Sequence, residues 1–215
     1  MNKIAIYGAG GCGREVLMLI QQINATENCW DFVGFYDDSV ASGTVVNNYK
    51  VLGGIDELNN CLNSIAIVIA VGNPVTKKKI FQSINNTNIF FPVLIHPGVL
   101  IGDRSIVTIG GGSIITASCI LTVNIKIGDH VLLNIGCTVC HDSTIKSFCS
   151  LMPAVNVSGE VMIDECVYIG TGAKIIHQIN IGSNSIIGAG AVVINDIPAD
   201  CTAVGVPAKC KQTIK

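Results

Sequence analysis

An aliphatic residue recurs at every sixth position through the second half of this 215-residue chain. The fifteen positions that follow this period are Ile109, Ile115, Leu121, Ile127, Leu133, Val139, Ile145, Leu151, Val157, Ile163, Ile169, Ile175, Ile181, Ile187 and Val193. A short fixed period is typical of a β-solenoid, in which each repeat adds one short strand to a stack. The period therefore predicts a β-solenoid in the second half of the chain.

A second position of the repeat, four residues after each aliphatic anchor, carries only small or β-branched residues. Such residues fit a crowded corner, and three cysteines, Cys119, Cys137 and Cys149, fall in this position. Glycine directly follows the anchor at Gly110, Gly128, Gly170, Gly182 and Gly188. We expect these glycines to provide positive φ in tight turns.

The first half of the chain has a different pattern, in which apolar strands alternate with helices. Strands are expected within residues 3–8, 31–38 and 64–72, and helices within 14–24 and 73–85. The first helix places a stripe of apolar residues on one face: Val16, Leu17, Leu19, Ile20 and Ile23. A strand, a glycine turn, a helix and a second strand together predict a parallel α/β unit.

The composition excludes several classes of protein. The formal net charge is −2 and there is no basic patch, so a nucleic-acid partner is not expected. The longest unbroken apolar run, residues 65–71, is far shorter than a membrane span. Glycines interrupt the first residues before any signal-peptide core forms, so we expect a cytoplasmic protein. Its ten cysteines lack paired metal spacing, which favours reduced, mostly buried thiols over a disulfide framework.

The stretch TVCHDS places His141 beside Asp142 in a region that is almost free of charge. A neutral imidazole accepts a proton near pH 7, so His141 is a candidate general base; the alternative is a surface histidine without a role. Adjacent residues of a strand point to opposite faces. Asp142 therefore orients the imidazole only if the backbone bends there, and it is otherwise a solvated turn residue.

The stretch GAGGCG, residues 8–13, fits the pattern G-x-G-x-x-G after a strand and before a helix. Backbone amides at such a helix N-terminus bind phosphate. Asp37 and Asp38 follow the second strand, where an acidic residue binds a ribose hydroxyl in dinucleotide-binding folds. By motif alone, a dinucleotide site is predicted.

Several motifs together resemble the family of sialic acid O-acetyltransferases and nucleotide-sugar N-acetyltransferases, which are hexapeptide-repeat acyltransferases. The motifs are YGAGGCGREV, FYDD, VGNP, IHP, the HD pair and the repeats that end in VGVPAK, and they cover essentially the whole chain. The resemblance implies a Rossmann-like domain over residues 1–91 that binds a nucleotide sugar. It implies a left-handed parallel β-helix over residues 92–215 that carries the acyltransferase site.

The resemblance also implies an activity, transfer of an acetyl group from acetyl-CoA to a sugar amine or hydroxyl without a metal. The acceptor is a nucleotide-linked amino sugar or sialic acid, in bacterial surface-glycan biosynthesis, and the assembly is a homotrimer. Three hexapeptides form one coil, so the fifteen repeats predict five coils, with residues 18 apart stacked at about 4.8 Å. Ile101 and Ile109 are eight residues apart, so we expect an irregular first coil.

Site residues follow from the same resemblance. His141 corresponds to the base and Asp142 to its orienting partner. The expected acetyl-CoA contacts are Ser150, Gly159, Thr171, Ala189 and Lys209, with Pro153, Thr171 and Ala189 in one column. The expected contacts to the nucleotide sugar are Gly10, Gly11, Cys12, Asp37, Asp38 and Gly72. Many relatives have His at the position of Cys12, so the acceptor sugar stays open.

Two other functions remain as alternatives. Some trimeric β-helices are metal hydratases that hold zinc with three histidines, but His141 and His177 lie two coils apart, too far to share one ion within a chain. A non-catalytic trimeric scaffold or nucleotide-sugar sensor would keep the N-terminal pocket without needing a base. Binding of acetyl-CoA distinguishes the enzyme from the scaffold.

Overall fold

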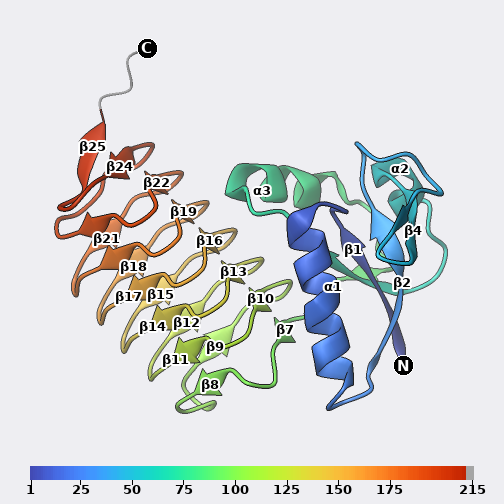
Figure 1. The fold of residues 1–215 in the computed structure, drawn as a ribbon, viewed down its shortest axis with the longest axis horizontal. Coiled ribbons are helices and arrows are strands. Elements are labelled where there is room, and N and C mark those ends of the chain that lie inside the picture. The colour runs from blue at the N-terminus through green and yellow to red at the C-terminus, as the bar shows by residue number, and fades with distance from the viewer. Residues whose placement is uncertain (212–215) are drawn as a thin grey trace.

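The computed structural model describes residues 1–211. Figure 1 shows two parts side by side, an α/β unit at the N-terminal end and a solenoid of stacked coils that leads to the C-terminus. The change from one to the other lies between β6, which ends at Phe90, and β7, which begins at Leu94.

The N-terminal unit contains one six-stranded sheet in the order β3-β4-β2-β1-β5-β6. Its strands are β1 (Asn2–Tyr7), β2 (Trp30–Tyr36), β3 (Val45–Val46), β4 (Tyr49–Gly53), β5 (Ile65–Ile69) and β6 (Ile89–Phe90). Its helices are α1 (Gly11–Asn24), α2 (Ile55–Asn59) and α3 (Pro74–Ser83). All strand pairs are parallel except β3 with β4, which confirms the predicted α/β unit.

Hydrophobic packing explains this arrangement. Every residue of β5 is buried, as expected for a strand covered on both faces. The predicted stripe of α1 packs on one side of the sheet, and apolar residues of α2 and α3 pack on the other. Helix α3 begins with Pro74 after the cap Asn73, whose side chain accepts a hydrogen bond from the backbone N–H of Thr76.

The second part is the predicted left-handed parallel β-helix, with three sheets. Sheet 1 contains β7 (Leu94–Ile95), β10 (Ile114–Ile115), β13 (Leu132–Leu133), β16 (Ser150–Leu151), β19 (Tyr168–Ile169), β22 (Ile186–Ile187), β24 (Thr202–Val204) and β25 (Lys209–Lys211). Sheet 2 contains β8 (Leu100–Ile101), β11 (Ile120–Leu121), β14 (Thr138–Val139), β17 (Asn156–Val157), β20 (Lys174–Ile175) and β23 (Val192–Val193). Sheet 3 contains β9 (Thr108–Ile109), β12 (Lys126–Ile127), β15 (Thr144–Ile145), β18 (Met162–Ile163) and β21 (Asn180–Ile181).

Residues 18 apart pair throughout the regular coils, for example Thr138 with Asn156. The β-helix begins two strands before the first of the fifteen repeats, because β7 and β8 pair with β10 and β11. The expected irregularity is a two-residue insertion, since β8 pairs with β11 at a separation of 20 and β9 with β12 at 18. The insertion is accommodated at the turn between β8 and β9.

The repeat anchors form the solenoid core. Fourteen of the fifteen are buried, and Ile109 in the first coil is half-buried. Every residue four positions after an anchor is buried as well, including Cys119, Cys137 and Cys149. Where this residue is serine, its hydroxyl donates to a backbone carbonyl, as Ser143 does to Ser158 at 3.0 Å, so no polar group is left unsatisfied there.

The turns between sheets contain residues with positive φ but, contrary to our expectation, these are not the glycines that directly follow the anchors. Positive φ recurs at the third residue after the anchor, including non-glycine residues such as Asp142 and Phe148. The glycines that directly follow the anchor are needed for close approach of adjacent coils instead. A Cβ on Gly170 would lie 2.6 Å from the backbone nitrogen of Ala189.

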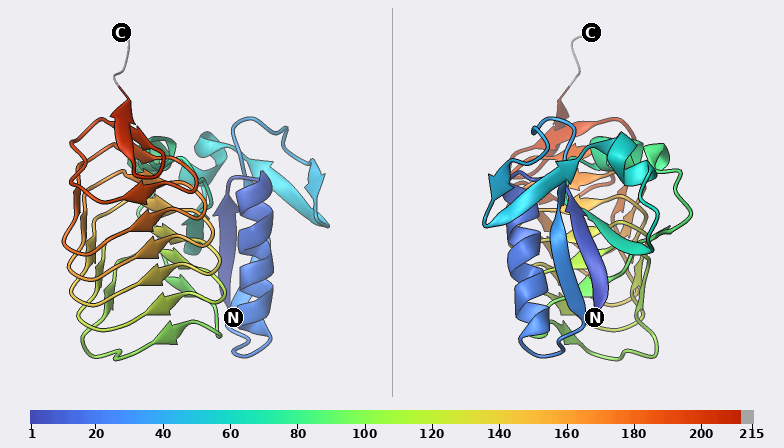
Figure 2. Two further views of the ribbon diagram at one scale, coloured as in Figure 1. Left: turned by 60° about the vertical axis from the view of Figure 1, so that its left-hand side comes forward. Right: turned by 90° about the vertical axis from the view of Figure 1, so that its right-hand side faces the viewer.

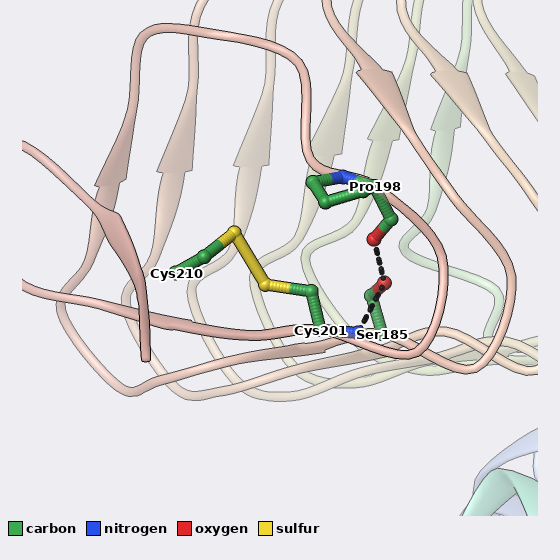
Figure 3. The surroundings of a disulfide bond; sticks show 4 residues. All are labelled: Ser185, Pro198, Cys201 and Cys210. Carbon is green, nitrogen blue, oxygen red and sulfur yellow. Dashed lines mark hydrogen bonds between the residues drawn. A yellow bond between two sulfur atoms is a disulfide. The ribbon is translucent and has the colours of Figure 1, made fainter. Parts of the chain in front are cut away.

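The expectation that all the thiols are reduced is wrong at the end of the β-helix. Cys201 and Cys210 form a disulfide across the hairpin β24–β25, beside Ser185 and Pro198 (Figure 3). The other eight cysteines are free. Sequence spacing gave no sign of this pair, because antiparallel pairing of β24 with β25 brings the two residues together.

Figure 2 shows the N-terminal unit along one face of the β-helix, and α1 contacts β7 of the first coil. Leu94, Ile114 and Leu132 point out of sheet 1 and are buried in the same cluster as the stripe of α1. The two parts therefore share one apolar cluster. A domain boundary near residue 91 remains our proposal. Within residues 1–211, no helix is both long and apolar enough to cross a bilayer.

Candidate active site

The β-helix has three edges, and each predicted site residue belongs to a particular one. The first edge joins sheets 1 and 2 and includes residues 153–154, 171–172 and 189–190. The second edge joins sheets 2 and 3 and includes residues 123–124, 141–142 and 159–160. The third edge joins sheet 3 to the next coil of sheet 1 and includes residues 129–130 and 147–148.

His141 and Asp142 lie at the second edge and contact each other. Nδ1 of His141 is 2.9 Å from Oδ2 of Asp142, because Asp142 has φ of 59° and turns its side chain back toward its neighbour. Asn124, one coil earlier, donates to Oδ1 of Asp142 at 2.8 Å. The hydrogen bonds with His141 and Asn124 lower the pKa of Asp142, so the carboxylate stays ionised near pH 7.

This pairing determines which imidazole nitrogen is free. An ionised carboxylate beside Nδ1 favours a proton on that nitrogen, which leaves the lone pair of Nε2 available. The His141 side chain is 56% exposed, and its ring lies over Gly159. A Cβ on Gly159 would be 2.4 Å from Nε2, so glycine is required beside the candidate base.

The predicted acetyl-CoA residues do not gather at one place in a single chain. Gly159 lies at the second edge with His141, whereas Thr171 and Ala189 lie at the first edge on the far side of sheet 2. Pro153, Thr171 and Ala189 do form a column, since Gly172 and Gly190 donate to the carbonyls of Pro153 and Thr171. Lys209 is exposed on β25, the last strand of the β-helix.

Ser150 is placed differently from the expectation. Its side chain is fully buried where α3 meets sheet 1, and its hydroxyl accepts a hydrogen bond from Nζ of Lys77 at 3.0 Å. A side chain in this position has no surface to present to acetyl-CoA. The Ser150 hydroxyl thus belongs to the contact between the two parts of the chain, and only the backbone of Ser150 remains a candidate contact for acetyl-CoA.

The glycine loop has the geometry of an anion site. Gly10 caps α1 without a side-chain hydrogen bond, and no atom lies within 4 Å of a Cβ built on Gly10 or Gly11. Gly8 has φ of 110°, and a Cβ on Gly13 would lie 1.9 Å from the carbonyl oxygen of Gly8. The loop thus keeps helix and strand in close contact and exposes backbone N–H groups.

Asp37 and Asp38 line a cavity of about 250 Å³ at the carboxyl ends of β2 and β4. The carboxylate of Asp37 accepts a hydrogen bond from the N–H of Ala9 at 2.8 Å, and that of Asp38 from the hydroxyl of Tyr7 at 2.5 Å. Burial raises the pKa of Asp37, but hydrogen bonds from Ser39 and Ala9 outweigh it and hold the pKa below its ordinary value. The aspartates therefore tie the glycine loop to this cavity.

Cys12 and Gly72 lie where the α/β unit meets the β-helix. Cys12 is in the first turn of α1 and packs in the cluster that contains Met152. Burial raises the pKa of Cys12 to about 11, so it is a neutral thiol. A Cβ on Gly72 would lie 3.9 Å from Cε of Met152. The predicted nucleotide-sugar residues thus extend from the aspartate cavity to the surface of sheet 1.

Sequence reasoning missed two residues that contact site residues. Asn124 lies 18 residues before Asp142, so the stacking period was a signal that could have identified it. Lys77 is the first of three consecutive lysines and the only one of the three that is buried, which the sequence alone does not indicate. His96 lies at the first edge and His130 at the third, whereas His141 and His177 lie two coils apart at the second. Within residues 1–211, no three His, Cys, Asp or Glu side chains converge as a metal would require.

A parallel β-helix with an exposed His–Asp pair, joined to an α/β unit with an open glycine loop, defines a hexapeptide-repeat acyltransferase. Residues 3–84 match the model of a protein family described as "PglD N-terminal domain". The GDP-perosamine N-acetyltransferase of Escherichia coli O157:H7 is 31% identical over 97% of this chain and 96% of its own. The chain belongs to this family of nucleotide-sugar N-acetyltransferases.

Two solved structures share the whole fold. The acetyltransferase domain of PglB from Neisseria gonorrhoeae, in complex with acetyl coenzyme A, is 33% identical, with a TM-score of 0.86 over 98% of this chain and 100% of that one. PerB from Caulobacter crescentus, in complex with CoA and GDP-perosamine, is 27% identical, with a TM-score of 0.85 over 98% of both chains.

Proposed function

We propose that this protein transfers the acetyl group of acetyl-CoA to the amine of a nucleotide-linked amino sugar. The observation that carries the proposal is the His141–Asp142 pair, with Nε2 free and exposed above Gly159. The open glycine loop and the aspartate cavity supply a place for the nucleotide. Of the relatives named above, the Escherichia coli protein is an N-acetyltransferase of GDP-perosamine, the PglB domain holds acetyl coenzyme A, and PerB holds CoA and GDP-perosamine. These relatives support an amine acceptor.

The chemistry requires one proton acceptor. As the sugar amine attacks the thioester carbonyl, a C–N bond forms, and the amine proton passes to Nε2 of His141. The C–S bond then breaks, and the CoA thiolate takes this proton from Nε2 as it leaves, which regenerates the base. Asp142 keeps the imidazole in the required tautomer throughout, because its carboxylate accepts from Nδ1.

The acetyl-CoA groove in this proposal is shared between two copies of the chain. Thr171 and Ala189 lie across sheet 2 from His141, so the first edge of one copy must meet the second edge of another. Sheet 2 carries exposed apolar residues between these edges, Leu100 and Ile120, which suit an interface. A closed ring of three copies satisfies this head-to-tail contact. Acetyl-CoA is held inside cells, so the proposal includes a cytoplasmic location.

A product screen by mass spectrometry tests the activity. The protein receives acetyl-CoA with GDP-perosamine, UDP-linked 4-amino sugars, sialic acid or serine, beside His141→Ala and His177→Ala variants. His177 lies two coils later at the same edge and serves as the matched control. We expect one acetylated nucleotide sugar, at least a ~100-fold loss in His141→Ala, and no loss in His177→Ala. If acetyl-CoA does not bind at all, the result favours the non-catalytic scaffold or nucleotide-sugar sensor over the enzyme.

Complementation tests the shared groove. Chains with His141→Ala and chains with Ala189→Trp are co-expressed, so that each lacks a different half of the site. In a random ring, about a quarter of the interfaces combine an intact base with an intact column, so about a quarter of wild-type activity should return. A co-expressed mixture as inactive as its parents contradicts the shared groove.

A further inference from the structure

A lysine is buried at the contact between the two parts of the chain. Lys77 on α3 is 2% exposed, whereas its neighbours Lys78 and Lys79 face outward. Its Nζ donates to the carbonyl oxygen of Cys149 at 3.1 Å and to the hydroxyl of Ser150 at 3.0 Å. Cys149 directly precedes β16 and Ser150 begins it, so the ammonium joins α3 to sheet 1.

No carboxylate neutralises this ammonium. The lysine ion pairs found among residues 1–211 involve Lys78 and Lys146, and Lys77 takes part in neither. The titratable groups around it are Cys12 of α1 and three residues of the β-helix, Cys149, Cys166 and His130. A buried ammonium with only neutral acceptors costs stability, so packing alone does not explain the lysine.

Burial lowers the pKa of Lys77 to about 8, although the neighbouring thiols of Cys149, Cys12 and Cys166 act in the opposite direction. His130 is the other cation-forming group at this contact. Burial and the charge of Lys77 lower the pKa of His130 to about 4, so it is neutral above pH 6. Near pH 8, Lys77 is thus the group whose charge changes at this contact.

Lys77 is also close to the proposed nucleotide site. Helix α3 begins two residues after Gly72, and Cys12 in the first turn of α1 is near enough to Lys77 to shift its pKa. The N-termini of α1 and α3 follow the adjacent parallel strands β1 and β5. Both helices therefore direct backbone N–H groups to the same end of the sheet, where a diphosphate would bind.

We propose that Lys77 is a positioning residue for the nucleotide sugar: its ammonium holds the start of α3 against β16 and supplies a buried counter-charge for the diphosphate at the N-termini of α1 and α3. This inference rests on the proposed function and assigns a role to a residue outside the catalytic pair. An anion at that place stabilises the charged form of Lys77, so binding of a diphosphate is linked to uptake of a proton near pH 8.

Titration calorimetry with GDP and UDP tests the linkage in the wild-type protein. Binding is measured at pH 8 in two buffers of different ionisation enthalpy. The terminal phosphate, with a pKa of about 6, is already ionised at this pH and contributes little. We expect uptake of up to about half a proton per site, because a group with a pKa near 8 becomes fully charged.

Two variants test the position. Lys77→Met keeps the length of the side chain without its charge, and Lys78→Met is the matched control on the same helix, because Lys78 faces Glu165. We expect Lys77→Met to raise KM for the sugar nucleotide and Kd for the nucleoside diphosphate at least about 10-fold, with KM for acetyl-CoA unchanged. Proton uptake should disappear in Lys77→Met and persist in Lys78→Met.

Each outcome bears on the inference. A wild-type protein that binds a nucleoside diphosphate at pH 8 without proton uptake overturns it, and this measurement stands even if Lys77→Met fails to fold. A folded Lys77→Met variant with wild-type KM also overturns it. If neither GDP nor UDP binds, the inference is wrong, while acetyl transfer itself is still decided by the product screen.

Discussion

The imidazole of His141 rests on the backbone of Gly159, one coil later, with no room for a β-carbon between them. Replacement of Gly159 by Ala would push the ring away from its present position, because the added atom would be 2.4 Å from both Cε1 and Nε2. A displaced base loses alignment with the amine, so we expect kcat to fall about 10- to 100-fold.

The matched control for Gly159→Ala is Val123→Ala, at the equivalent position one coil before His141. Truncation of this exposed side chain creates space and pushes nothing. Steady-state kinetics of both variants, with circular dichroism to verify the fold, make the comparison. Gly159→Ala at wild-type kcat would show that the observed ring position is not the reactive one.

Asn124 should affect kcat through Asp142, because it donates to Oδ1 of that carboxylate while Oδ2 contacts His141. Asn124→Ala removes this bond and leaves the His141–Asp142 contact in place, so we expect a several-fold loss in kcat. The pKa of Asp142 lies below its ordinary value, so this carboxylate is ionised throughout the working range. A pH–rate profile should therefore keep its shape above pH 5 in Asn124→Ala; a new ionisation in that range contradicts the assignment.

His130 should make the fold sensitive to acid. It is buried against Phe148 and 3% exposed, and its Nδ1 has no hydrogen-bond partner among residues 1–211. Burial and the charge of Lys77 lower its pKa from 6.5 to about 4. Between these values the unfolded chain binds a proton that the folded chain does not, so stability falls as the pH drops through this window. The loss at pH 4.5 should be about 2–3 kcal/mol.

His130→Phe provides the measurement for this acid response. Phenylalanine keeps an aromatic ring beside Phe81 and Phe148 and removes the unsatisfied nitrogen, so we expect a gain of about 1–3 kcal/mol at pH 7. Urea unfolding at pH 7 and pH 4.5 should show a smaller acid loss than in the wild type. His177→Gln, at an exposed position, is the control, and an equal acid loss in all three proteins argues against His130.

The Cys201–Cys210 disulfide should stabilise the last hairpin of the β-helix. The two residues are nine positions apart, and closing a loop of this length contributes about 2–3 kcal/mol. Hydrogen exchange of residues 202–211 should become faster after reduction, and Cys210→Ser should behave like the reduced protein without reductant. Exchange that does not respond to reduction means that β24 and β25 hold together without the bond.

Much of this architecture could be predicted from local regularity. The anchors identify the solenoid because every sixth side chain must enter one narrow core, and the stripe of α1 identifies its buried face. The contact of His141 with Asp142 could not be predicted in this way, since it depends on the positive φ of Asp142. The environments of Lys77 and Ser150 depend on the packing of two units that are remote in sequence. The Cys201–Cys210 pair depends on a single antiparallel strand in an otherwise parallel β-helix.

Residues 18 apart stack on each other in the regular coils, and this period limits how the β-helix can change in length. Loss of one hexapeptide before His141 would rotate everything after it by a third of a turn relative to the N-terminal unit. The catalytic pair would then be carried to another edge, even though every core position would still be filled by an aliphatic residue. Only whole coils can be gained or lost there without reorienting the site. The turn between β8 and β9 can absorb two extra residues because residues 102–106 are exposed there, and the register of the later coils stays intact.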